Sequence, residues 1–109
     1  MDFSLTEEQV ALRNLVREIM EERVKPRAAE IDERGEFPEW VRDLFAQQGL
    51  FATVIPPEYG GFDGSLLTQC LVMEEVARVC ASSSMMLGNQ SLGSSPIALY
   101  GTEEQKQKW

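Results

Sequence analysis

The stretch VCASSSMMLGNQSLGSSPIALYGT, residues 79–102, contains no charged side chain, although 26% of the whole chain is charged. Its length and its Ser, Gly and Met content predict a helix enclosed by other helices, by a ligand, or by both. A further helix start follows at Thr102, and the chain reaches its last residue, Trp109, soon afterwards. We therefore expect these residues to be one piece of a longer protein.

The composition is that of a single globular domain, because 109 residues with 43% hydrophobic content are enough to build one core. The net charge of −8 disfavours a nucleic-acid partner, since phosphate binding needs a basic face. The same negative charge disfavours an anionic membrane surface. We expect neither a nucleic-acid nor a membrane partner.

Histidine is absent, which excludes histidine-based acid–base chemistry and histidine metal ligands from these residues. Cys70 and Cys80 lie in apolar helical patterns without metal or redox spacing, and we expect both to be buried thiols in a reducing compartment. Met1 leads into polar residues rather than into a secretory signal, and residues 79–102 are too polar to span a membrane. The predicted location is the cytoplasm.

A first helix is predicted from Thr6, because Gln9 completes a capping box with it. Pro26 is expected to kink this helix or to end its first part, since proline lacks the N–H that an inner helical position needs. Gly35 is the predicted stop. Apolar side chains repeat along this helix at helical spacing: Leu12, Leu15, Val16, Ile19 and Met20.

A second helix is predicted from Pro38 to Gly49, because proline suits a first turn and glycine suits a helix end. Its expected inward face consists of Phe37, Trp40, Val41, Leu44 and Phe45. Residues 50–64, LFATVIPPEYGGFDG, should form an extended apolar run and then a Pro/Gly-rich loop, since paired prolines and glycines prevent a continuing helix.

Three further helix starts follow. Ser65 begins a third helix that is apolar on most sides and therefore central, and the serines at 82–84 begin a fourth that ends near Gly101. Thr102 caps a fifth. The predicted fold of residues 1–109 is therefore all-α, an up-and-down-like helical bundle with one extended Pro/Gly-rich loop.

Candidate catalytic groups are few. The stretch from Gly88 to Gly93 resembles a nucleophile elbow only faintly, because its spacing is wrong and no strand precedes it. Glu74 and Glu75 point about 100° apart on a helix and cannot share a proton, so an ion pair between Glu74 and Arg78 is the better interpretation. Three methionines are interpreted as adaptable packing rather than as metal ligands: Met73, Met85 and Met86. We predict no catalytic, metal-binding or cofactor-binding residue within this chain.

The fourth predicted helix contains Gly88, Gly93 and Pro96, which together lower its helix propensity by roughly 5 kcal/mol. A tertiary interaction must compensate for this loss. Small residues could let a neighbouring helix approach closely, or missing side chains could leave a cavity for an apolar ligand beside Met85, Gly88 and Leu92. The residues alone favour neither explanation.

The chain resembles the N-terminal helical domain of the acyl-CoA dehydrogenase family over its whole length. The matching segments occur in the order of the family. They are FSLTEEQ (3–9), FPEW (37–40), GLFATVIPPEYGG (49–61), MEEVARVCAS (73–82), SLGSSPI (91–97) and YGTEEQKQKW (100–109).

This resemblance implies an enzyme that uses FAD to oxidise an acyl-CoA to its trans-2-enoyl-CoA. In the family, a carboxylate removes the α-proton, the β-hydrogen leaves as hydride to the flavin, and electrons pass to an electron-transferring flavoprotein. Family subunits also have a β middle domain and a C-terminal helical domain, and mostly form tetramers. Those two domains supply most flavin contacts and the catalytic carboxylate, so we expect residues 1–109 alone to hold FAD weakly or not at all and to be inactive.

The resemblance also implies that the fourth helix lines the far end of the acyl pocket, with Ser84, Met85, Gly88 and Leu92 as neighbours of the acyl chain. Some medium-chain members carry a larger residue at the position of Gly88. Glycine should therefore leave a deeper or differently shaped pocket for a longer or branched chain, unless Met85 and Met86 refill it. Two alternatives remain: an acyl-CoA oxidase or related flavoprotein on the same scaffold, and a non-catalytic helical interaction module.

Overall fold

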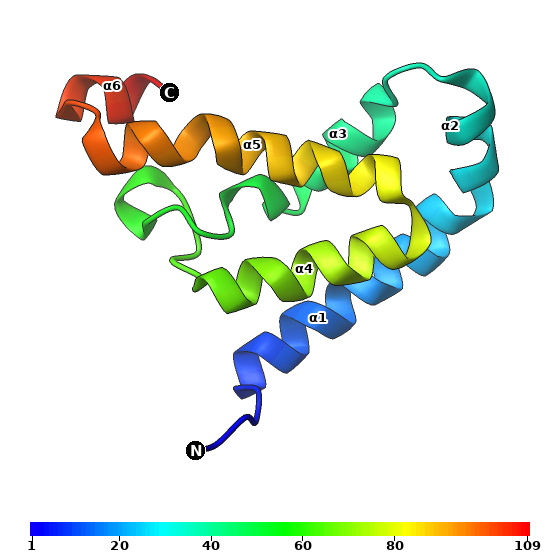
Figure 1. Cartoon of the computed structure of the whole chain (residues 1–109), viewed down its shortest axis with the longest axis horizontal. Coiled ribbons are helices and arrows are strands. Elements are labelled where there is room, and N and C mark those ends of the chain that lie inside the picture. The colour runs from blue at the N-terminus through cyan, green and yellow to red at the C-terminus, as the bar shows by residue number, and fades with distance from the viewer.

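The computed structural model describes all 109 residues, Met1–Trp109. It contains helices and no strand, which confirms the all-α prediction. The longer helices are α1 (Glu7–Ile19), α2 (Ala28–Arg34), α3 (Glu39–Gln47), α4 (Leu66–Val79), α5 (Ala81–Tyr100) and α6 (Glu103–Lys108) (Figure 1). Four short helical turns connect them: η1 (Met20–Val24), η2 (Lys25–Arg27), η3 (Leu50–Ala52) and η4 (Pro57–Tyr59).

The first helix starts and breaks where the sequence predicts. The Thr6 hydroxyl accepts a hydrogen bond from the Gln9 amide, and the Gln9 side chain accepts one from the Thr6 amide, which is the predicted capping box. Before Pro26 the backbone widens into the π turn η1 and then tightens into the 3-10 turn η2, because Pro26 cannot donate a helical hydrogen bond. Gly35 ends α2 with a left-handed φ of 59°.

The second predicted helix is α3, and one expected core residue lies outside it. Pro38 occupies the N-cap of α3, so Phe37 precedes the helix and is 61% exposed rather than inward-facing. Val41 and Phe45 are fully buried, as predicted. Gly49, just beyond the helix end, has a φ of 71°, which confirms its predicted left-handed conformation.

Residues 50–64 are not extended as predicted, because two 3-10 turns, η3 and η4, compact them. The Asp63 amide donates to the Ile55 carbonyl at 2.9 Å, which brings the end of the segment back to its beginning. Gly61 lies so close to Ile55 that a Cβ atom would overlap the Ile55 carbonyl group, so only glycine fits there. The loop is therefore compact, and its turn η3 packs against α5.

Three helices form one layer, with α4 between α1 and α5 (Figure 1). α4 and α5 are an antiparallel hairpin joined at Cys80, whose extended backbone separates the two helices. α1 runs parallel to α4, since their side-chain contacts keep a separation of 57–59 residues from one end to the other. The parallel arrangement requires residues 28–64 to cross back along the layer.

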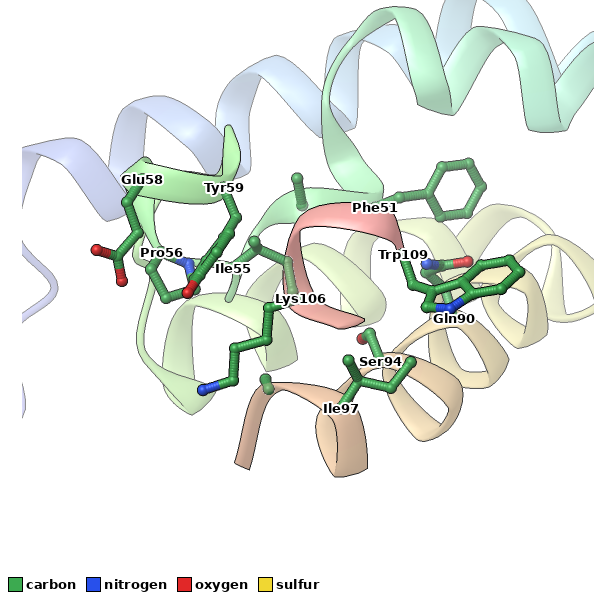
Figure 2. Close-up of a pocket in the computed structure, with 12 residues that line it drawn as sticks. Phe51, Ile55, Pro56, Glu58, Tyr59, Gln90, Ser94, Ile97, Lys106 and Trp109 are labelled. Atoms are coloured by element: carbon green, nitrogen blue, oxygen red, sulfur yellow. The ribbon is translucent and has the colours of Figure 1, made fainter. Parts of the chain in front are cut away.

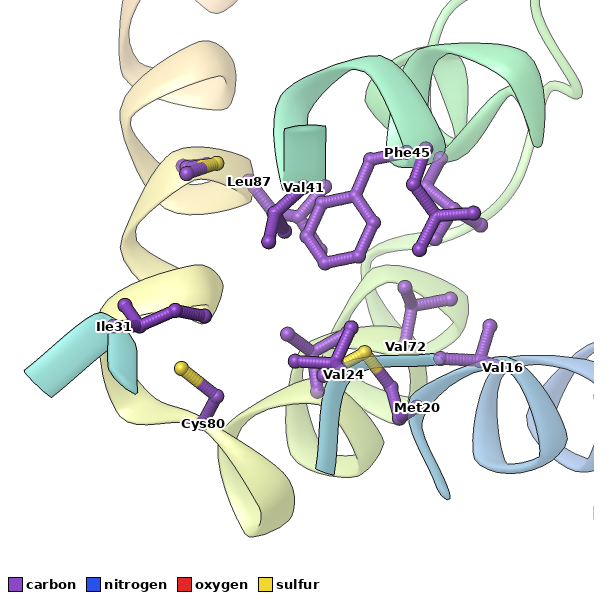
Figure 3. Packing of buried hydrophobic residues seen from close by; sticks show 13 residues of the cluster. Val16, Met20, Val24, Ile31, Val41, Phe45, Val72, Cys80 and Leu87 are labelled. Atoms are coloured by element: carbon purple, nitrogen blue, oxygen red, sulfur yellow. The ribbon is translucent and has the colours of Figure 1, made fainter. Parts of the chain in front are cut away.

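The core lies on the inner side of this layer, where α3 and η3 cover α1 and α4 (Figure 3). Its largest fully buried side chains are Phe45 and Met20. Cys80 is buried as predicted, whereas Cys70 is exposed, because α4 turns it away from the core. No helix is both long enough and apolar enough to cross a membrane.

Candidate functional site

The contact between α1 and α4, here called the α1/α4 seam, contains a charged network. Arg17 donates to both carboxylate oxygens of Glu75, at 2.6 and 3.0 Å, and Glu75 is only 5% exposed. Arg78 contacts Glu75 at 3.4 Å and Glu21 at 2.9 Å. The predicted partner Glu74 is wrong, since Arg78 reaches the neighbouring carboxylate on the α1 side of α4 instead.

Glu75 is the one buried carboxylate of the chain, but its surroundings do not suit a general base. The hydrogen bonds from Arg17 lower its pKa against the opposing effect of burial. A catalytic base for carbon acids needs a raised pKa. Glu75 therefore joins two helices rather than removing protons.

The contact between α4 and α5, here called the α4/α5 seam, contains no charge. The Gln69 side-chain amide donates to the Ser91 hydroxyl at 2.7 Å. A Cβ added to Gly88 would lie 3.4 Å from the Met73 terminal methyl, and no other atom outside its own helix would be within 4 Å. This is ordinary van der Waals contact, so a methyl group would fit at Gly88 and the approach of α4 does not by itself require glycine.

The other side of the same two helices is an uncovered apolar surface. Helical spacing brings its residues to the side opposite the core, on adjacent turns of two antiparallel helices. We call it the outer α4/α5 face. Its apolar members are Leu66, Cys70, Met85, Gly88, Leu92 and Leu99, Met73 lies at its inner edge against the core, and its α4 side also carries the exposed carboxylate Glu74. The other helices of this chain therefore do not enclose α5, because Met85 is 59% exposed and Leu92 is 74% exposed.

Three of the four predicted substrate neighbours share this face. Met85, Gly88 and Leu92 follow one another along it at helical spacing. Ser84 does not join them, because it is buried and its hydroxyl donates to the Ala81 carbonyl at 2.7 Å. A hydroxyl satisfied in this way can stay next to an apolar ligand without needing water.

A hollow of about 690 Å³ lies beside the first half of α5, between it and residues 31–42. Met85 lines this hollow, whereas Ser84, Gly88 and Leu92 do not. Met85 therefore connects the outer α4/α5 face to the largest space beside the helix.

A second hollow, of about 360 Å³, lies between the second half of α5, the η3–η4 loop and α6 (Figure 2). None of the predicted substrate neighbours lines it. Its walls include the charged side chains Glu58 and Lys106, and the Tyr59 hydroxyl at its edge is bound to Glu103 at 2.7 Å. The α5 side of the outer α4/α5 face, which carries no charge, suits an acyl chain better.

The sequence interpretation missed the contact between Met73 and Gly88. Two antiparallel helices joined by a tight turn pair residues that lie equally far from that turn. Met73 and Gly88 are each about seven residues from the junction at Cys80 and Ala81. The pairing could therefore have been deduced once the turn was placed.

Neither hollow fits FAD, whose diphosphate needs several free donors or cations. Arg42 in the larger hollow is already bound to Asp43 at 2.8 Å. Lys106 in the smaller one lies among the acidic residues Glu58 and Glu103. We assign no flavin contact and no reaction step to these residues.

Residues 6–109 match the sequence profile of the family described as acyl-CoA dehydrogenase, N-terminal domain. The cyclohex-1-ene-1-carbonyl-CoA dehydrogenase of Geobacter metallireducens is 43% identical over 96% of this chain and 28% of its own length. The short-chain specific acyl-CoA dehydrogenase of Clostridium acetobutylicum is 44% identical over 100% of this chain and 29% of its own. The chain thus spans less than a third of these relatives.

Solved structures share the same fold. Butyryl-CoA dehydrogenase from Megasphaera elsdenii superimposes with a TM-score of 0.89 at 32% identity, over 100% of this chain and 30% of its own. A chain in a structure from work on the electron-transferring flavoprotein of Acidaminococcus fermentans and flavin-based electron bifurcation gives a TM-score of 0.95 at 34% identity. It is covered over 29% of its length.

Proposed function

Because this chain belongs to the acyl-CoA dehydrogenase family, as its N-terminal domain, we propose that it walls the acyl end of the substrate pocket in an FAD-dependent enzyme. The complete enzyme would oxidise an acyl-CoA to its trans-2-enoyl-CoA. The observation that carries this proposal is the α5 side of the outer α4/α5 face, an exposed stretch of helix without charge whose middle is Gly88.

The chemistry of that face suits a hydrocarbon chain. Each buried methylene contributes about 0.8 kcal/mol, and α5 has no charged group that would lose its water when a chain covers it. Met73 and Met85 contribute flexible thioethers that adapt to chains of different shape. The proposed role of this chain is therefore to bind and orient the acyl group and to exclude water from it.

The remaining parts of the reaction are assigned to residues outside this chain. When bound there, FAD would accept the hydride from the β-carbon. The electrons would pass to an electron-transferring flavoprotein, and the complete subunits would form a homotetramer. Residues 1–109 offer no free buried carboxylate as a base, since Glu75 is bound by Arg17 and Arg78.

The test is an assay of the full-length protein with acyl-CoA thioesters of increasing chain length and an artificial electron acceptor. We expect FAD-dependent formation of the enoyl-CoA, and no turnover or flavin absorbance from residues 1–109 alone. Failure of the flavin-loaded protein to oxidise any acyl-CoA would refute the proposal.

The same assay separates the two alternatives. An acyl-CoA oxidase would produce hydrogen peroxide from dissolved oxygen at a rate similar to that with the artificial acceptor. A non-catalytic interaction module would bind no flavin, either as the full-length protein or as residues 1–109. The family relationship favours the dehydrogenase over both.

A further inference from the structure

Gly88 leaves less space than its missing side chain suggests. The Met73 terminal methyl lies 3.4 Å from the position that a Gly88 Cβ would take, which is ordinary van der Waals contact. No other group outside α5 comes within 4 Å of that position. One side chain from α4 therefore borders the gap that glycine leaves in α5.

The space behind Met73 is closed. A cavity of only about 10 Å³ lies there, between Val72, Leu87 and Ser91, and it holds at most one water molecule. Val72 and Leu87 belong to the core. The Met73 side chain thus separates the outer α4/α5 face from the closely packed interior.

The other two nearby methionines do not fill the same position. Met86 is 9% exposed and points to the opposite side of α5, into the core and the larger hollow. Met85 lies on the outer α4/α5 face but is 59% exposed. Met73 is held between α4 and α5, so it alone can close the gap at Gly88 from below.

We propose that Met73 is a specificity-determining residue that forms the floor of the acyl slot beneath Gly88. This inference rests on the proposed function. The unbranched thioether has three rotatable bonds, so its methyl shifts without displacing the backbone. A chain that reaches Gly88 meets this methyl, and its length and branching are selected by how far the methyl yields.

The experiment uses the full-length enzyme loaded with its flavin, and measures kcat/KM across straight acyl-CoA thioesters of increasing length. Met73→Ala removes the floor, and we expect the ratio of long-chain to short-chain kcat/KM to rise about tenfold, since each additional buried methylene is worth about fourfold. Gly88→Leu fills the slot from the other helix, and we expect the ratio to fall by a similar factor.

The two substitutions should not act independently, because their side chains compete for one space. In Gly88→Leu enzyme, adding Met73→Ala should restore much of the long-chain activity. Met73→Leu keeps the volume of the floor while shortening its reach, so it preserves folding and should still shift the optimum towards longer chains.

Met86→Ala is the matched control, since it removes the same side chain from the opposite side of α5. It should leave the chain-length ratio unchanged even where it lowers stability. An unchanged ratio in both Met73 variants, with Gly88→Leu still shifting it, would overturn this inference and leave the proposed function standing. Absence of acyl-CoA oxidation in the unmodified enzyme would instead remove the proposed function itself.

Discussion

The α1/α4 seam and the α4/α5 seam of the three-helix layer differ in the kind of residue that forms them. The α1/α4 seam contains a buried carboxylate with two arginine partners, whereas the α4/α5 seam contains glycine, serine and methionine without any charge. In the first, the buried Glu75 carboxylate already has two arginine partners within the chain. The second leaves the uncharged outer side of α5 uncovered, and for this reason we propose the acyl-chain site on α5 rather than at Glu75, the only buried acid.

The largest effect on stability is expected from removing an ion pair of the α1/α4 seam. Arg17→Ala leaves the buried Glu75 carboxylate with Arg78 alone, and should lower the free energy of unfolding by about 2 kcal/mol. The loss is smaller than for a fully enclosed pair because the Arg17 side chain is half exposed. Urea unfolding followed by circular dichroism measures it. Arg23→Ala, on the same helical stretch without an ion pair, should change almost nothing, and an equal loss there would contradict the assignment.

The contribution of the α1/α4 seam to stability should also decrease at acidic pH. The pKa of Glu75 is lowered from its ordinary value of 4.5, so its contribution to stability is complete above that pH and is lost as the pH falls through the lowered value. In the double variant Arg17→Met, Glu75→Leu this part of the acid dependence should disappear. Unfolding measured at a series of pH values below 4.5 gives the comparison, and parallel curves for the two proteins would show that Glu75 is not responsible.

The uncharged helix α5 should tolerate a substitution that improves its helix propensity. A Cβ at Gly93 would meet no atom within 4 Å, so Gly93→Ala should raise the free energy of unfolding of this chain by up to about 1 kcal/mol. Gly35→Ala is the contrasting control, because the φ of 59° at Gly35 strains any other residue and should make that variant less stable. Thermal unfolding of both variants tests the prediction, and a destabilised Gly93→Ala protein would show that α5 needs glycine for its own packing.

The smallest effect concerns α6, which lies beyond the end of the neutral seam. The Tyr59 hydroxyl donates a hydrogen bond to Glu103 of α6, and this bond raises the pKa of Tyr59 to about 12. The contribution of this bond to stability is complete below the ordinary value of 10.0 and is lost as the pH rises towards 12. Spectroscopic titration of the phenol in Glu103→Gln should show Tyr59 ionising at lower pH. An unchanged titration would mean that the bond does not form in solution.

Local signals predicted most of the helix boundaries. The capping box at Thr6, the break before Pro26 and the left-handed glycines at 35 and 49 depend only on neighbouring residues, and each is found as expected. Phe37 was misplaced because the helix begins one position later than an inward-facing pattern requires. Local signals are sufficient wherever a backbone group finds its partner within one turn.

The errors at the candidate site have a different origin. Cys70 was expected to be buried because an apolar helix does not reveal which of its sides the other helices cover. The choice of Glu75 over Glu74, and the contact of Met73 with Gly88, both depend on which helix lies on which side of α4. Which helices lie next to each other is decided by the packing of the whole layer, so it cannot be predicted from any one segment of the sequence.

The parallel course of α1 and α4 has a consequence for how the chain acquires its structure. Arg17 and Glu75 are 58 residues apart, whereas Gln69 and Ser91 are separated by 22. Closing the longer segment costs about 1 kcal/mol more chain entropy, so the α4/α5 hairpin should form early and the charged pairing late. The proposed wall of the acyl pocket would then be among the first parts of the molecule to fold, and the ion pairs between α1 and α4 would form afterwards.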